Sequence, residues 1–389
     1  MHNLNKIRVA FFLACFLFTH SSLAICGSIN KVIIFHPLSN ESCSLSIEND
    51  TTRTRIYLIG DTGKKAVISK NYKQFSQFIS TDTPSCVLYL GDNVYPKGIR
   101  PVGDKNHDTD VEKMKIQLRL LKNHRGQMYM IPGNHDWQMG KTKGLEYVQR
   151  EHDLVNQYLR DSLTQYTEGD AHYFKYPGFA GPEKIELDGI TLIMVDTDWW
   201  VHHQVGHPVG LIDNSVKKTE ALFFQQFDAY LKEAQGKGQK IAVVTHHPMY
   251  LTGANSLKMQ PTRFLITYTP FKILGMAGMN RAVRGMSPQF NYKRMVEKFE
   301  KHVAPYKHIL WISGHDHDQQ LIVKNNITQI ISGNGGEFRT VENRDKMVKW
   351  YNDKTTGFSK IELSKNGTVH VFFYDADGKE LYKEEVKSE

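Results

Sequence analysis

The sequence contains little cysteine and no long hydrophobic run. Only four cysteines occur among 389 residues, and none has the spacing of a zinc-binding motif, so a disulfide-rich or zinc-ribbon scaffold is excluded. The longest apolar segment, residues 9–18, is about half as long as a helix needs to cross a bilayer. Repeats, low-complexity tracts and the basic runs typical of nucleic-acid binding are also absent. We therefore expect an ordinary globular protein without a nucleic-acid partner.

The N-terminus has the pattern of a cleaved export signal. Lys6 and Arg8 precede the apolar segment 9–18, and Ser22 and Ala24 are the small residues that signal peptidase reads. We expect the mature protein to be secreted or periplasmic, with no stable membrane anchor after cleavage. The predicted organisation is a signal peptide (1–24), an N-terminal extension (25–53) and one main domain (54–389).

The charge balance indicates what kind of ligand the surface favours. Lys and Arg number 49 against 41 Asp and Glu, which gives a net charge of +8, and 18 histidines add to it at lower pH. A basic surface attracts anions, although charge alone does not distinguish a phosphate ester from other anionic partners.

Short apolar runs that end in Gly, Asp, Asn or His alternate with segments of helical periodicity. The runs occupy residues 55–63, 87–96, 128–137, 190–200, 241–248 and 308–318. The helical segments between them occupy residues 64–80, 109–124, 143–160, 215–235 and 288–304. Continuous apolar runs of this length predict strands buried on both faces. Their alternation with helices predicts an α/β fold with a largely parallel sheet.

Beyond residue 320 the pattern changes to strands without helices. We expect these strands to form a second, more antiparallel sheet that packs on the first. Residues 251–287 match neither period and predict a surface insertion near the strand ends, of the kind that often covers a site.

Side chains that bind metals stand at five of the predicted strand ends. They are Asp61, Asp92, Asn134, His246, and the pair His315 and His317. Ligands of open α/β sheets bind beyond the carboxyl ends of the strands. Carboxylates neutralise a pair of cations, and imidazole and amide groups complete the coordination without excess charge. Each residue alone also fits a helix cap, a turn or a packed loop histidine, but the ordered set predicts a site for two cations.

These motifs resemble those of the calcineurin-like metallophosphoesterase superfamily. Most members begin with D-x-H, whereas this chain has Asp61-Thr62-Gly63. Tyr95, three residues after Asp92, is similar to the tyrosine of the purple acid phosphatase branch, and a phenolate suits a trivalent ion. The short N-terminal extension resembles the small, single-domain form. The resemblance implies an α/β fold of two packed mixed β-sheets flanked by helices, a four-layer α/β/β/α sandwich.

The resemblance also implies a role for each candidate ligand. The first metal, Fe(III), would be bound by Asp61, Asp92, Tyr95 and His317. The second, Fe(II), Zn(II) or Mn(II), would be bound by the bridging Asp92 with Asn134, His246 and His315.

Three further side chains are candidates for catalysis. His135, next to Asn134, is placed to contact the phosphate or protonate the leaving alcohol, with Asp136 as its orienting carboxylate. A salt-linked loop is the alternative for this pair. His247 either faces the substrate or packs behind the metal ligands.

The expected function is therefore that of an exported dinuclear acid phosphatase. It would hydrolyse small phosphate monoesters by attack of a metal-bound hydroxide. A phosphodiesterase, nucleotidase or pyrophosphatase on the same site is the nearest alternative. A non-catalytic metal-binding surface protein is the alternative from a different class.

Overall fold

The computed structural model of the chain divides into two units, Met1–Thr51 and Thr52–Glu389. In the first unit, β1 (Lys31–Phe35) pairs with β2 (Leu45–Asn49) in an antiparallel ladder. The predicted signal peptide lies outside the described residues, as does most of the predicted insertion. The described residues are 31–35, 45–49, 52–82, 84–167, 169–176, 178–202, 211–251, 279–340 and 346–386.

The second unit contains two seven-stranded sheets, and the first has the order β16-β15-β14-β3-β4-β5-β6. Its parallel part consists of β3 (Thr52–Ile59), β4 (Ser85–Tyr89), β5 (Gly126–Met130) and β6 (Ala171–Tyr173). Its antiparallel part consists of β14 (Gly357–Ser364), β15 (Val369–Asp375) and β16 (Glu380–Val386).

The second sheet has the order β13-β11-β12-β10-β9-β8-β7. Its parallel strands are β8 (Ile190–Val195), β9 (Lys240–Thr245), β10 (Ile309–Ser313) and β12 (Ile327–Ser332). Antiparallel pairing adds β7 (Glu183–Leu187), β11 (Gln319–Lys324) and β13 (Val348–Asn352) at its edges.

The strands beyond residue 320 do not form a sheet of their own, so that part of the sequence prediction is wrong. β11, β12 and β13 extend the second sheet, whereas β14 joins the first sheet by pairing Ile361 with Ile56. Each group of parallel strands has edges with unpaired N–H and C=O groups, and a C-terminal strand pairs with one edge of each group, β14 with β3 and β11 with β12. Both sheets are therefore mixed.

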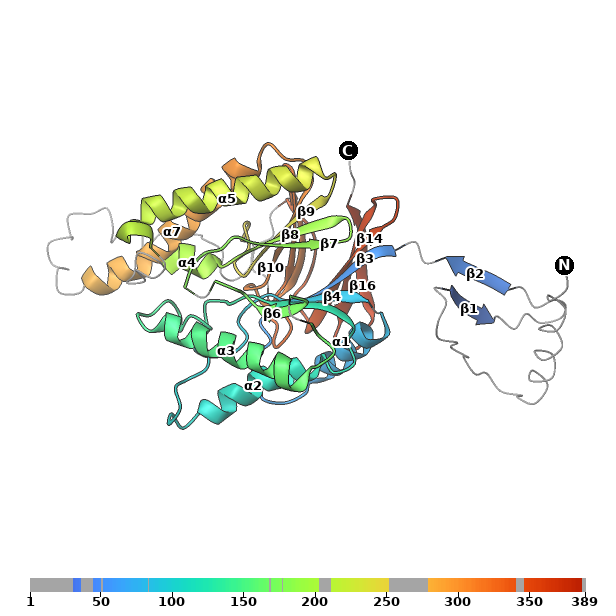
Figure 1. Cartoon of the computed structure of the whole chain (residues 1–389), viewed down its shortest axis with the longest axis horizontal. Helices are drawn as coiled ribbons and strands as arrows, with labels where there is room; N and C mark the ends of the chain where they lie inside the picture. Colours follow the sequence, from blue (N-terminus) through green and yellow to red (C-terminus); the bar gives the residue numbers. More distant parts are fainter. Residues whose placement is uncertain are drawn as a thin grey trace. The chain divides into compact units, whose positions relative to one another are not determined.

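Helices cover the outer face of each sheet (Figure 1). On one side lie α1 (Lys70–Thr81), α2 (His107–Arg119) and α3 (Gly144–Ser162), and on the other lie α4 (Thr197–His202), α5 (Val216–Gly236) and α7 (Met279–Val303). Ser69 and Ser215 cap α1 and α5 by accepting backbone N–H groups. None of the helices in the described residues is long and apolar enough to cross a membrane. The predicted fold, two packed mixed sheets flanked by helices, is confirmed.

The run predicted as a strand over residues 190–200 ends earlier than expected. β8 stops at Val195, and the following residues form the short helix α4. Trp199 and Trp200 of this helix are buried in a cluster with Phe223 and Phe299 from the two long helices. Aromatic packing thus continues the hydrophobic pattern while the backbone changes from strand to helix.

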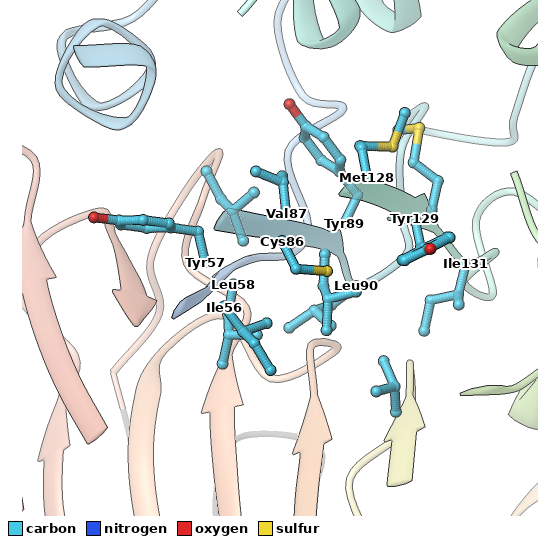
Figure 2. Close-up of a cluster of buried hydrophobic side chains, with 14 of the residues drawn as sticks. Ile56, Tyr57, Leu58, Cys86, Val87, Tyr89, Leu90, Met128, Tyr129 and Ile131 are labelled. Carbon is cyan, nitrogen blue, oxygen red and sulfur yellow. The ribbon is translucent and has the colours of Figure 1, made fainter. Parts of the chain in front are cut away.

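The central strands are apolar because both of their faces are covered. All five residues of β4 are buried, since helices pack on one face and the second sheet on the other. Figure 2 shows side chains of β3, β4 and β5, with Leu90 and Ile131 just beyond them, in this core. Cys86 in β4 is a buried free thiol.

A buried histidine makes this core sensitive to acid. His124 is fully buried, with Nε2 3.1 Å from the Ser85 hydroxyl and Nδ1 2.6 Å from the Tyr166 hydroxyl. Burial lowers the pKa of His124 to about 4, so the folded chain holds a neutral imidazole. The unfolded chain takes up this proton below about pH 6.5. The stability that the folded chain gains from the neutral His124 is therefore fully present above about pH 6.5 and is lost as the pH falls towards 4.

We expect His124 to account for about 2 kcal/mol of the stability lost between pH 7 and pH 4.5. Urea unfolding of the metal-free protein at both pH values measures this loss. The variant His124→Gln should lose less on acidification by about that amount, even if its stability at pH 7 is lower. Equal losses in the variant and the natural chain would contradict the assignment.

Candidate metal centre

The predicted ligands meet where the carboxyl ends of the parallel strands of both sheets come together. Asp61, Asp92 and Asn134 follow β3, β4 and β5 of the first sheet, whereas His246 and the pair His315 and His317 follow β9 and β10 of the second. Backbone bonds join the two edges, since Gly60 N–H, after β3, donates to Ser332 O of β12 and Gly335 N–H, after β12, donates to Gly60 O. The site is thus built by both sheets and not at the edge of one.

Backbone conformation at the centre departs from the usual regions. Asp61, Asp92 and His315 have φ values of 57°, 55° and 69°, in the left-handed region that residues other than glycine seldom occupy. Such conformations cost free energy and persist where the surrounding structure imposes them. Here they direct three of the candidate ligands into the centre.

The first group of donor atoms surrounds the Tyr95 hydroxyl. The hydroxyl oxygen lies 2.8 Å from Asp61 Oδ1, 2.9 Å from Asp92 Oδ2 and 2.9 Å from His317 Nε2. Nε2 of His317 also lies 3.4 Å from Asp61 Oδ1. All four side chains are buried. Two carboxylates, one phenol and one imidazole therefore lie within contact distance of one another.

The second group adjoins the first through Asp92. Asn134 Oδ1 lies 3.2 Å from His246 Nε2 and 3.0 Å from His315 Nδ1, and the two ring nitrogens are 3.3 Å apart. Asp92 Oδ1 lies 3.4 Å from His246 Nε2, while its other oxygen faces Tyr95. The two oxygens of Asp92 therefore belong to different groups, as a bridging ligand requires.

Protons balance the charge of the centre when no metal is bound. Burial raises the pKa of Tyr95 well above its ordinary value, and the carboxylates of Asp61 and Asp92 raise it further. Burial opposes protonation of His246, but Asp92 outweighs this and the pKa of His246 rises to about 10. Burial likewise raises the pKa of Asp92, yet His246 brings it below its usual range. A cation would displace these protons, since metal ligands bind in their deprotonated forms.

The donor chemistry fits cations of the kind that bind oxygen and nitrogen. Ligand atoms of Asp61, Asp92 and His246 all lie within 4.8 Å of one another in a fully buried cluster. Carboxylate, amide, phenol and imidazole groups suit zinc, manganese and iron ions. Residues 54–319 match the family described as Calcineurin-like phosphoesterase. The chain belongs to this family.

One curated relative matches most of the chain. Tartrate-resistant acid phosphatase type 5 of Mus musculus is 21% identical over 324 residues, which cover 80% of this chain and 82% of the relative. This confirms the predicted resemblance as a distant relationship to that acid phosphatase.

Two solved structures have a similar fold. GAP50, the anchor in the inner membrane complex of Plasmodium, has a TM-score of 0.51 and 19% identity, and the match covers 87% of this chain and 90% of that one. PhoD has a TM-score of 0.51 and 10% identity, with 87% and 72% covered.

His135 lies on the open side of the centre. Its backbone N–H donates to Asp92 Oδ1 at 2.8 Å, and its Nδ1 lies 2.8 Å from the Pro96 carbonyl oxygen. The ring packs against Tyr95 with centroids 4.1 Å apart, and 22% of its side chain is exposed. His135 is thus held beside the first group while one part of its ring remains accessible.

Asp136 does not orient His135 as the sequence suggested. Its carboxylate is fully buried and accepts the backbone N–H groups of Asn93, Val94 and Gly133 and the Asn93 amide. The Pro96 carbonyl oxygen, and not the Asp136 carboxylate, contacts Nδ1 of His135. Asp136 instead ties the loop after β4 to the loop after β5, because a buried carboxylate needs several N–H donors.

His247 packs behind the second group. Thr197 Oγ1 accepts its backbone N–H at 3.0 Å and lies 2.9 Å from its Nδ1. Its ring centroid is 4.5 Å from that of His315. Burial lowers the pKa of His247 well below its ordinary value, and the neighbouring His315 lowers it further. His247 is therefore a neutral imidazole at the inner side of the centre.

The sequence interpretation missed a segment that follows β12. Gly333, Gly335 and Gly336 lie so close to the ligand loops that a Cβ atom on them would meet backbone oxygens at 2.1, 2.5 and 2.6 Å. Glu337, the next residue, contacts His317. A glycine-rich run ending in an acidic residue at the carboxyl end of a strand is the signal that indicates it.

Proposed function

We propose that this phosphoesterase is a dinuclear metal-dependent acid phosphatase that hydrolyses phosphate monoesters. The observation that carries the proposal is the arrangement of seven donor side chains in two groups that share Asp92. The distant relationship to tartrate-resistant acid phosphatase supports the choice of reaction within the family.

The first group would hold a trivalent iron, because three of its four members can act as anionic oxygen ligands. It consists of Asp61, Asp92, Tyr95 and His317. The second group would hold Fe(II), Zn(II) or Mn(II) on the bridging Asp92 with Asn134, His246 and His315. Two such cations supply charge stabilisation for the phosphoryl oxygens and lower the pKa of a water molecule.

The protein's own residues would orient the ester and manage its proton. His135 has an accessible ring beside the first group, so it is the residue we assign to the phosphate or the leaving alcohol. Its hydrogen bond to the Pro96 carbonyl directs Nε2 to the opposite side. His247 has no open face, being 2% exposed, and we assign it to holding His315 in place. The predicted signal peptide supports a secreted or periplasmic location.

Hydrolysis of a panel of phosphate esters tests this function. The purified mature chain, loaded with iron and zinc, should bind two metal ions and hydrolyse simple monoesters faster than diesters, nucleotides or pyrophosphate, with an optimum below pH 7. A preference for diesters, nucleotides or pyrophosphate would overturn the monoester assignment. Two bound metals without hydrolysis of any ester would favour a non-catalytic role.

The variant Tyr95→Phe tests the iron assignment. A phenolate bound to Fe(III) gives the protein a visible absorption band, so we expect the natural chain to be coloured and Tyr95→Phe to be colourless. Absorption spectra of the iron-loaded proteins measure this. Tyr129→Phe, at a buried tyrosine whose hydroxyl contacts Gly169 instead, should keep the band. A colourless natural chain that is fully active with zinc or manganese alone would contradict the assignment.

A further inference from the structure

The segment 332–339, which we call the brace, connects two of the three ligand loops of the first group. Gly335 N–H donates to Gly60 O next to Asp61, and Gly333 N–H donates to Asp318 O next to His317. The glycines are necessary because a side chain there would collide with backbone atoms at 2.1 to 2.6 Å. The brace is therefore packed directly behind these ligands.

The brace holds His317 at two points. The Arg339 N–H donates to the His317 carbonyl oxygen at 2.8 Å, and Glu337 Oε1 lies 2.7 Å from His317 Nδ1. The other ring nitrogen, Nε2, faces Tyr95 and Asp61. Glu337 thus lies on the side of the imidazole away from the donor group and is not itself placed as a ligand.

The carboxylate of Glu337 is held in turn by two positively charged side chains. Lys64 Nζ lies 3.1 Å and an Arg339 guanidinium nitrogen 2.9 Å from Oε1. Lys64 also lies 4.5 Å from the centre of the Tyr95 ring. The contact with Lys64 links Glu337 of the brace to the loop after β3, although 32% of the Glu337 side chain is exposed. Such a restrained carboxylate can orient the ring beside it.

We propose that Glu337 is a positioning residue that fixes the His317 ring for metal binding. The proposal rests on the proposed function. The Nδ1–H of His317 does not point straight at the carboxylate in this structure, so the contact is an ion pair at 2.7 Å and not a linear hydrogen bond. A carboxylate on the second nitrogen of a ligating histidine fixes its tautomer and increases its basicity, and its loss typically weakens metal binding 10- to 100-fold.

The test is the Fe(III) affinity of the mature chain, measured by competition with a chelator. Glu337→Ala should weaken binding at the first group by about 10- to 100-fold, and Glu337→Gln, which keeps an oxygen acceptor without charge, should fall between. The matched control is Glu186→Ala, at a similarly exposed surface carboxylate held by Lys184 and Lys237, and this variant should bind Fe(III) as the natural chain does.

Two further measurements separate the possible failures. Unfolding of the metal-free variants should match that of the natural chain within about 1 kcal/mol, since loss of a partly exposed ion pair costs little. With iron bound, the absorption band of Glu337→Ala should shift. Natural affinity and an unshifted band in Glu337→Ala would overturn the proposal, as would equal weakening in Glu186→Ala. If the natural chain itself binds no metal, the proposed function fails instead.

Discussion

Replacing Asp92 by asparagine is expected to abolish phosphatase activity, with a fall in kcat of roughly 10³-fold or more, the scale of removing one key electrostatic group from an active site. Asp92 is the one side chain shared by both donor groups, with Oδ2 2.9 Å from the Tyr95 hydroxyl and Oδ1 3.4 Å from His246 Nε2. An amide has one oxygen and no charge, so it cannot serve both groups. Rates on a simple monoester and the metal content of the variant measure the effect.

A control at a surface carboxylate distinguishes this loss from a general effect of removing charge. Asp188→Asn changes an exposed aspartate that pairs with Arg53, and it should keep the activity and both metals. Asp92→Asn should bind at most one metal. Retention of two metals and of more than a tenth of the activity in Asp92→Asn would show that no bridging carboxylate is required.

A single methyl group at Gly133 is expected to disrupt the centre from the backbone side. A Cβ atom there would lie 2.3 Å from Asp92 Oδ1, 2.4 Å from the Asp92 nitrogen and 2.8 Å from His246 Cε1. Overpacking of this kind typically costs about 1–3 kcal/mol. We expect Gly133→Ala to lose activity by about 100-fold or more, because misplacing reacting groups by about 1 Å costs that much.

The matched control for this variant is Gly236→Ala. Gly236 ends α5, and a Cβ atom on it would meet no atom within 4 Å. This change should leave activity unaltered and stabilise the fold by up to about 1 kcal/mol, because alanine loses less conformational entropy on folding than glycine. Thermal unfolding and monoester hydrolysis measure both variants. Full activity in Gly133→Ala would contradict the close approach of the loop after β5 to Asp92.

The sequence predicted most elements of the central sheets because their signal is local. Strands such as β4 and β9 are buried on both faces, so they read as continuous apolar runs. The edge strands β6 and β7 were not predicted, since three or five residues with mixed polarity carry little periodicity. The local sequence pattern also did not predict that β14 joins the first sheet, because its partner β3 is some 300 residues away in the chain.

Side-chain partners were harder to predict than side-chain positions. Asp136 follows His135 directly, yet it turns to the backbone of Asn93 and Val94, 43 and 42 residues away. The glycine-rich run before Glu337 indicates a close approach of the backbone but not the partner of Glu337, because its role depends on contact with His317 and Lys64 from other loops. Adjacency in sequence indicated neither partner.

The sequence by itself determined which donor groups stand at the strand ends, because an apolar strand and the polar residue that follows it are encoded by neighbouring residues. The local pattern did not determine how those donors divide into two groups around Asp92; the family resemblance implied the division, and only the tertiary structure decided the contacts within each group. Tyr95 and His317, which meet at 2.9 Å, are 222 residues apart, and their contact depends on the packing of two sheets. That packing also brought Glu337 to the back of His317, because β12 carries the brace to the same edge as β3 and β10.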